Sequence, residues 1–234
     1  MSNPGLVPVC ILAGGVGSRL GDRVRSVPKP LVEVAGEPFL LHQLRLLRSH
    51  GAHRVVLCIG YLGDQIVEVV GDGSAFELDV DYSYDGPELI GTAGAIRKAL
   101  PRLGDRFLVV YGDTYLRIDY ADVVAAHVAS GLPALMTVLR NDGRWDVSNA
   151  DFDGRLVRYD KRSPSADWRW IDYGLGVLSA EAMVTAPDAH DLADVYASLA
   201  AGDRLGGYVA TERFYEIGTP SALAETSRFL TRLT

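Results

Sequence analysis

The first half of the chain alternates between short apolar runs and longer segments with helical periodicity. Apolar or alternating runs predict strands at residues 7–13, 54–59, 77–83 and 106–111. Between them, apolar positions recur every three to four residues and predict helices over 38–50, 61–70 and 92–100. Strands that alternate with helices through short connections are typical of a parallel, doubly wound sheet with helices on both faces.

The pattern changes after about residue 133. Further strand-like runs occupy residues 134–139, 145–152, 155–160 and 174–179, and helices are expected near 180–186, at 190–201 and from about Pro220 to the end. The turn Asp153-Gly154 predicts a hairpin between two of these strands. No repeat or linker interrupts the chain. We therefore expect an α/β fold in a single domain over residues 1–234, with one Rossmann-like, doubly wound mixed sheet and a β-rich second half.

Composition limits the classes of partner. With 48% hydrophobic residues among 234, the chain can bury a full core. A net charge of −7 argues against nucleic acid and against an anionic membrane surface, because both are bound mainly by surface Lys and Arg. The N-terminal residues resemble no secretory signal, and no apolar run approaches the roughly 20 residues that span a bilayer. We expect a cytoplasmic protein.

The two cysteines, Cys10 and Cys58, each lie inside an apolar run. They are interpreted as small buried hydrophobic residues in neighbouring strands, in preference to a disulfide or a metal site.

The segment that follows the first strand combines positive charge with glycine. Arginines and Lys29 lie among Gly14, Gly15, Gly17 and Gly21, and a proline stands on each side of Lys29. Bare backbone N–H groups and cationic side chains suit an anionic ligand such as phosphate. A Rossmann fingerprint fits poorly because Leu20 occupies the place of the third glycine, and no Walker A sequence is present. In open sheets, ligands bind beyond the carboxyl ends of the strands, here the loops after residues 13, 59, 83, 111 and 139.

At this point the sequence resembles a known family. The segment "LAGGVGSRL…PKPL" is similar to the signature of sugar-1-phosphate nucleotidyltransferases, and the resemblance covers nearly the whole chain. Its other parts are "GTAGAI" at 91–96, "VVYGDT" at 109–114 and "YEIGTP" at 215–220. The segment "EPFLLHQL" and the short length are most similar to D-glycero-α-D-manno-heptose 1-phosphate guanylyltransferases. The resemblance implies the nucleotide-diphospho-sugar transferase fold.

The resemblance also implies a role for particular residues. It assigns catalysis to Arg19 and Lys29. The Arg19 guanidinium offers a planar fork to phosphate oxygens, and the Lys29 ammonium offers a compact point charge. The implied nucleotide-binding residues are Leu12, Ala13, Gly14, Gly15, Gly17, Ser18, Gly91, Thr92 and Gly112. Asp113 and Glu216 are the implied ligands of Mg²⁺, which would complete its coordination with substrate phosphates and water. Family members more often carry Asp at the position of Glu216.

The implied acceptor site departs from the family pattern. Lys161 matches the lysine that the family uses on the acceptor phosphate. The other implied acceptor-binding residues are Trp145, Asp146, Asp172, Tyr173 and Gly174. The segment "IDYGLGVL" at 171–178 replaces the usual Asn-Ala-Gly, and Asp146 stands where a glycine is common. Carboxylates at Asp146 and Asp172 suit sugar hydroxyls or an ammonium group, so these residues do not decide the chemical identity of the acceptor.

The function that the resemblance implies is condensation of an NTP with a sugar 1-phosphate, of heptose or mannose type, to an NDP-sugar and pyrophosphate. Residues 1–132 would bind the nucleotide and 133–234 the acceptor. One alternative is the same transfer to a non-sugar phosphate or phosphonate. Another is a catalytically silent regulatory module that binds a nucleotide sugar. The motifs do not indicate the nucleobase, and an exposed apolar helix face would allow a homodimer.

Overall fold

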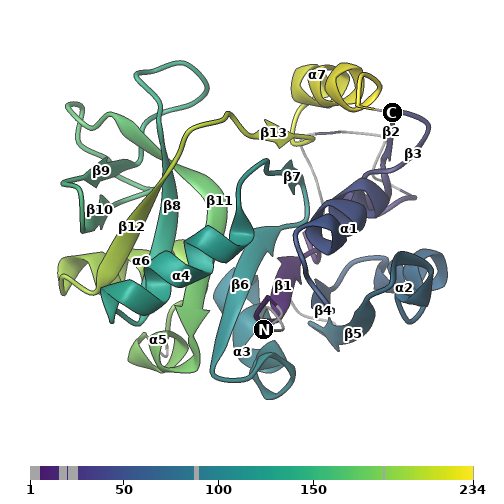
Figure 1. Cartoon of the computed structure of the whole chain (residues 1–234), viewed down its shortest axis with the longest axis horizontal. Helices are drawn as coiled ribbons and strands as arrows, with labels where there is room; N and C mark the ends of the chain where they lie inside the picture. Colours follow the sequence, from purple (N-terminus) through teal and green to yellow (C-terminus); the bar gives the residue numbers. More distant parts are fainter. Residues whose placement is uncertain (1–5, 16–19, 21–25, 87–89, 187, 234) are drawn as a thin grey trace, which may run out of the picture.

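The computed structural model describes residues 6–15, 20, 26–86, 90–186 and 188–233. Its centre is a parallel group of four strands in the order β5-β4-β1-β6 (Figure 1). They are β1 (Val9–Leu12), β4 (Arg54–Ile59), β5 (Asp79–Tyr84) and β6 (Arg106–Tyr111). Leu12 is in register with Cys58 on one side and with Tyr111 on the other. The carboxyl ends of all four strands therefore lie at one edge of the sheet.

The strands of the second half extend the same sheet and make it mixed. The strand β11 (Trp170–Ser179) pairs antiparallel with β6 and joins the two halves. Beyond it lie β8 (Ala134–Arg140), β12 (Leu205–Ala210), β9 (Ala150–Phe152) and β10 (Val157–Tyr159). The strands β9 and β10 form the hairpin predicted at Asp153-Gly154, while β8 is antiparallel to β11 and parallel to β12. The sheet thus has nine strands among the described residues.

Helices cover both faces of the sheet, as the alternating pattern predicts. One apolar cluster joins the sheet to α1 (Phe39–Ser49), α2 (Gly63–Val70) and α4 (Tyr120–Ser130). The other joins it to α3 (Gly91–Leu103), α5 (Ala180–Thr185) and α6 (Leu192–Ala201). The doubly wound α/β architecture is therefore confirmed. No helix in the described part of the chain has the length and apolarity needed to cross a bilayer.

A third apolar cluster anchors the C-terminal helix beside the first half of the chain. The helix α7 (Pro220–Leu230) packs against two short ladders and against Val32, which directly follows the 3₁₀ turn η2 (Lys29–Leu31). One ladder pairs β2 (Glu33–Val34) with β3 (Glu37–Pro38), and the other pairs β7 (Thr114–Tyr115) with β13 (Tyr215–Glu216). A second 3₁₀ turn, η3 (Ser74–Phe76), precedes β5. The β7–β13 ladder brings the end of the chain to the loop that follows β6.

The predicted strand over 145–152 is wrong in its first part, since only Ala150–Phe152 is extended. The buried side chain of Asn141 organises residues 141–148 as a turn instead. Its Nδ2 donates to the Asp146 carbonyl at 2.7 Å and to the Ser148 hydroxyl at 3.0 Å, and its Oδ1 accepts from the Trp145 amide at 3.2 Å. These bonds replace ladder hydrogen bonds.

Among the elements longer than three residues, α4 and β12 were not predicted. The helix α4 has ordinary boundary signals: the Asp119 side chain accepts from two amides of the first turn, and Gly131 ends the helix with φ +65°. Its weak amphipathic pattern concealed it. The strand β12 contains two glycines, which are rare in strands.

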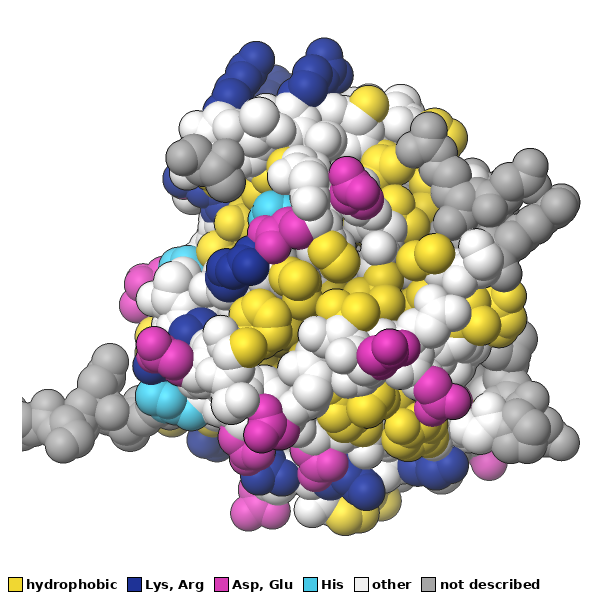
Figure 2. All heavy atoms as spheres, turned by 90° about the vertical axis from the view of Figure 1, so that its right-hand side faces the viewer, with side chains coloured by type: hydrophobic (Ala, Val, Ile, Leu, Met, Phe, Trp, Pro, Cys, Tyr) yellow, Lys and Arg dark blue, Asp and Glu magenta, His cyan; other side chains and the backbone are white. Residues whose placement is uncertain are grey.

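Figure 2 shows the molecule from the side on which α2 and β5 lie, with hydrophobic side chains gathered near the middle and charged groups around them. The exposed apolar residues in and beside α2 and β5 are Tyr61, Val69 and Tyr84. A homodimer through such a face stays a prediction.

Candidate active site

A cavity of about 440 Å³ opens at the carboxyl ends of the four parallel strands. Its walls come from the loops after β1, β5 and β6, from the start of α3 and from the segment before α6. The lining residues are Leu12, Ala13, Gly14, Gly15, Lys29, Pro30, Cys58, Asp85, Ile90, Gly91, Thr92, Ala95, Tyr111, Gly112, Asp113, His190, Asp191 and Gly218. The cavity lies where the strand pattern places a ligand in an open sheet.

The glycine loop supplies a wall without side chains. The Ala13 amide donates to the Cys58 carbonyl at 2.8 Å, so the chain stays beside β4 just past the end of β1. A Cβ on Gly14 would lie 2.5 Å from Asp85 Oδ2, so a larger residue there would require the Asp85 side chain to move. The predicted nucleotide-binding residues Leu12, Ala13, Gly14 and Gly15 all line the cavity. Gly17, Ser18 and Arg19, also singled out in the sequence, lie outside the described residues.

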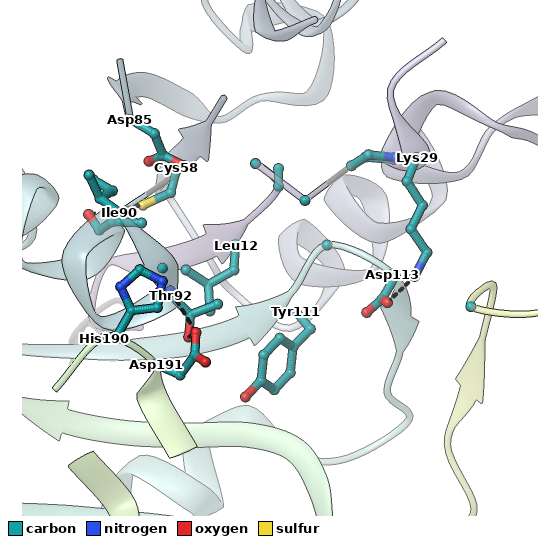
Figure 3. A pocket seen from close by; sticks show the side chains of 18 residues that line it. Leu12, Lys29, Cys58, Asp85, Ile90, Thr92, Tyr111, Asp113, His190 and Asp191 are labelled. Carbon is teal, nitrogen blue, oxygen red and sulfur yellow. Dashed lines mark hydrogen bonds and ion pairs between the residues drawn. The ribbon is translucent and has the colours of Figure 1, made fainter. Parts of the chain in front are cut away.

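Lys29 and Asp113 form an ion pair at one end of the cavity (Figure 3). Their side chains are 12% and 26% exposed, respectively, so the pair is largely withdrawn from water. Pro28 and Pro30 restrict the backbone on both sides of Lys29. The loop that carries Asp113 is held from α1, because Gln43 Nε2 donates to the carbonyls of Tyr111 and Thr114, each at 2.9 Å. A cation and an anion therefore lie together at this end of the cavity.

Glu216 is brought beside this pair by the β7–β13 ladder. It is in register with Thr114, and the neighbouring Ile217 amide donates to the Asp113 carbonyl at 3.0 Å. Among the residues that the structure describes, no three His, Cys, Asp or Glu side chains gather as a metal-binding group. Mg²⁺ is commonly held by one or two carboxylates together with substrate phosphates and water. Asp113, in the turn between β6 and β7, and Glu216, at the end of the neighbouring β13, fit that requirement.

The opposite end of the cavity is formed by the start of α3. Gly91 has φ +68°, and a Cβ there would collide with the His190 carbonyl. The Ala93 amide donates to the same carbonyl at 3.0 Å, and the Thr92 hydroxyl accepts from the Leu192 amide at 2.7 Å. Residues 190–192 therefore bind tightly to the start of α3. Gly91 and Thr92 line the cavity, as does Gly112 on the β6 side.

Several lining residues were not singled out in the sequence. Asp85 carried a usable signal, since it directly follows a parallel strand and the loop there was expected to hold chemistry. Tyr111 ends a strand in the same way. His190 and Asp191 carried no such signal. They come from the second half of the chain, and only the contact between α6 and α3 brings them to the cavity.

Of the predicted acceptor residues, Gly174 lies nearest to the cavity. It has φ +93°, and a Cβ there would lie 3.6 Å from both the Tyr111 ring and the Thr114 side chain. Burial raises the pKa of Asp172 to about 6, although the Gly174 amide donates to its carboxylate at 2.9 Å and Lys161 opposes the shift. The Asp172 charge in turn contributes to the raised pKa of Tyr111, which burial mainly causes. The poorly solvated carboxylate of Asp172 therefore lies close to Tyr111 in the cavity wall.

The other predicted acceptor residues lie elsewhere. Tyr173 is buried in the core on the α1 and α4 side of the sheet, with its ring against Phe214. Lys161 is exposed on the loop after β10. Trp145 packs against Phe214, and Asp146 lines a second cavity of about 510 Å³ together with Trp168. None of these side chains lines the first cavity.

The two cysteines lie in neighbouring strands, as predicted. Both thiols are free and buried, with their sulfur atoms 3.5 Å apart, and Cys58 lines the cavity floor. The hydrogen bond from Cys58 and burial together raise the pKa of the Cys10 thiol. A buried thiol with a raised pKa is a poor nucleophile.

Comparison with known proteins identifies the class to which this cavity belongs. The family described as "Nucleotidyl transferase" matches residues 9–144, more than half of the chain. The matched region includes the glycine loop, Lys29, the start of α3 and Asp113. The chain belongs to this family, and the resemblance seen in the sequence is confirmed.

Individual relatives carry different bases and sugars in their names. An N-acetylmuramate alpha-1-phosphate uridylyltransferase of Neisseria meningitidis is 41% identical over 124 residues, which are 53% of each protein. A mannose-1-phosphate guanylyltransferase of Mycobacterium tuberculosis is 29% identical across 97% of this chain and 65% of its own length. The chain therefore spans between about half and two thirds of the length of these two curated relatives.

The fold is shared with a solved structure over nearly the whole chain. HddC from Yersinia pseudotuberculosis, complexed with GMP-PN, has a TM-score of 0.77 at 24% identity and covers 96% of this chain and 100% of its own. At this identity the likeness establishes the α/β fold alone.

Proposed function

We propose that this protein transfers a nucleotidyl group from an NTP to a sugar 1-phosphate and releases pyrophosphate. The observation that carries the proposal is the cavity itself. Lys29 and Asp113 lie at one end, a bare glycine wall follows β1, and the start of α3 closes the other end. Family membership supports the same reaction.

In this reaction a phosphate oxygen of the acceptor attacks the α-phosphorus of the NTP. The bond from that phosphorus to the bridging oxygen of the β-phosphate breaks, and pyrophosphate leaves with the electron pair. The attacking oxygen is already anionic, so no general base is needed. The remaining difficulty is repulsion between two polyanions and charge that develops on the leaving group.

The residues at the cavity meet that difficulty by charge and by position. We assign Lys29 to the α-phosphate oxygens, and Arg19, which lies outside the described residues, to the departing phosphates. Asp113 and Glu216 would hold Mg²⁺, which neutralises phosphate charge when it is bound. Asp113 forms an ion pair with Lys29, so each of the two charges has a partner of opposite sign.

The acceptor is assigned to the side of the cavity formed by β11. Gly174 adjoins the Asp113 loop, and Asp172 keeps a buried carboxylate there although burial disfavours its charge. Such a carboxylate is retained more readily where it binds a ligand. We assign Asp172 to hydroxyl groups of the sugar, with Lys161 near the acceptor phosphate, and place heptose and mannose 1-phosphates first among the acceptors.

The test is pyrophosphate release by the purified protein in the presence of Mg²⁺. ATP, CTP, GTP, UTP and dTTP are each combined with a panel of sugar 1-phosphates that includes heptose and mannose. Release that needs one NTP and one sugar phosphate, and that falls in Lys29→Ala, is expected. Nucleotide binding by calorimetry without release from any pair would contradict the transfer and favour a binding-only protein.

A further inference from the structure

Asp85 is a cavity residue that the reaction described above does not use. It directly follows β5, and its amide donates to the Ile59 carbonyl at 2.8 Å, which continues the pairing with β4 and fixes the backbone. In Figure 3 its side chain lies with Cys58 and Ile90 at the end of the cavity opposite the Lys29–Asp113 pair. Since phosphates belong with Lys29, this far end is left for the nucleobase.

The surroundings of Asp85 leave its carboxylate available to accept hydrogen bonds from a ligand. Oδ1 is shielded from solvent and has no hydrogen-bond partner among the residues that the structure describes. Oδ2 lies against the glycine wall, since Cβ atoms on Gly14 and Gly60 would be 2.5 Å and 3.1 Å from it. Lys98 donates to the Asp85 backbone carbonyl at 3.3 Å rather than to the carboxylate, which forms no ion pair within the described part of the chain. A half-buried carboxylate with one shielded, unpartnered oxygen is more favourable where a ligand supplies the donors.

The walls around this carboxylate suit a flat, largely apolar ring. Ile90 and Cys58 lie at the same end, Leu12 and Ala95 also line the cavity, and glycines at 14 and 91 permit close approach (Figure 3). An aromatic base between such walls would present its polar edge to Asp85. The chemistry of that edge then decides which base is accepted.

We infer that the protein selects a guanine nucleotide, because the Asp85 carboxylate has only hydrogen-bond acceptors to offer the base edge. Guanine alone has two adjacent donors there, N1–H and the 2-amino group. Adenine and cytosine each place a ring-nitrogen acceptor beside their amino group, and uracil and thymine flank one N–H with two carbonyls. Any of these would direct a lone pair at the carboxylate. The inference deepens the proposed function and rests on it for the orientation of the nucleotide.

Burial raises the pKa of Asp85, while the Lys98 charge lowers it. A protonated carboxyl would offer one donor and one acceptor, the pattern that suits the other bases. Binding is therefore measured at pH 8, which favours the ionised carboxylate.

The first experiment is calorimetry of the whole protein with Mg²⁺ and no acceptor. Wild type should bind GTP about 10- to 100-fold more tightly than inosine triphosphate, which lacks only the 2-amino group, because one charge-assisted hydrogen bond is lost. UTP and ATP should bind more weakly still. Equal affinity for GTP, inosine triphosphate and UTP would overturn the inference.

The second experiment changes the hydrogen-bond donors and acceptors that the side chain at position 85 offers. Asp85→Asn presents one acceptor and one donor, which matches xanthine, where a carbonyl replaces the 2-amino group of guanine. The variant should lose affinity for GTP about 10-fold or more and prefer xanthosine triphosphate. Asp79→Asn, an exposed residue of β5, is the matched control and should keep the GTP preference. A variant that folds, as circular dichroism shows, and still prefers GTP would overturn the assignment of Asp85.

These tests separate the inference from the proposed function. Selective GTP binding without pyrophosphate release from any acceptor would contradict the transfer and leave the base assignment standing. Release with UTP or dTTP in preference to GTP would support the transfer and overturn the base assignment. Failure to bind any nucleotide would overturn both.

Discussion

Replacement of Asp172 by Asn is expected to stabilise the protein at neutral pH. The carboxylate has an ordinary pKa of 3.8, and burial raises it to about 6 in the folded protein. That difference corresponds to about 3 kcal/mol of unfavourable free energy at pH values above 6. Part of the residue stays accessible to water, so we expect about 1–3 kcal/mol. Asn keeps an oxygen that accepts from the Gly174 amide and removes only the charge.

The sign follows from the direction of the shift. Between pH 3.8 and about 6 the folded state binds more protons than the unfolded state, so stability falls as pH rises through this window. The gain in Asp172→Asn should be full at pH 7.5 and fall to about a third at pH 4.5. Urea unfolding of wild type and variant at both pH values measures the difference, with Asp79→Asn as the control at an exposed site. A difference that is the same at both pH values would refute the burial argument.

The remaining predictions concern the cavity. Lys29→Ala should lower turnover at least about 10²-fold, the usual scale for the loss of one transition-state donor. A change under threefold would contradict the catalytic role of Lys29. Lys29→Arg keeps the positive charge and changes the shape of the side chain, so it shows which of the two the reaction needs. Asp113→Asn should raise the Mg²⁺ concentration for half-maximal pyrophosphate release, and an unchanged requirement would argue against a metal ligand. Gly91→Ala should destabilise the protein by about 1–3 kcal/mol more than Gly131→Ala, measured by urea unfolding, because both have positive φ but only Gly91 faces the His190 carbonyl. Equal effects of the two glycine substitutions would show that the collision is relieved.

Stability and recognition are opposed at two carboxylates of this protein. Asp85 and Asp172 are both disfavoured as anions by burial, and neither has a cationic side chain in a direct ion pair among the described residues. Each adjoins the cavity from a different half of the chain. If both bind substrate, as proposed, the free energy lost on folding is recovered through ligand donors on binding.

The second half of the chain shows where local patterns mislead. Residues 145–149 look like a strand because apolar and polar residues alternate, yet the Asn141 side chain holds this segment as a turn. Tyr173 was expected beside Asp172 at the acceptor, but successive side chains of a strand point to opposite faces, and Tyr173 is in the core. Neither the turn nor the burial of Tyr173 could be predicted without knowing which residues each segment contacts.

The sequence by itself determined the parallel core, the hairpin at Asp153-Gly154 and the glycine loop with Lys29, because periodicity, glycine and proline act over a few residues. It also placed Asp113 at a strand end. Only the tertiary structure decided that Asp85 lies opposite Lys29 and that His190 closes the start of α3. The physical reason is that sheet order and helix docking set these distances, through hydrophobic contacts between segments far apart in the chain, and no local pattern encodes which segments meet.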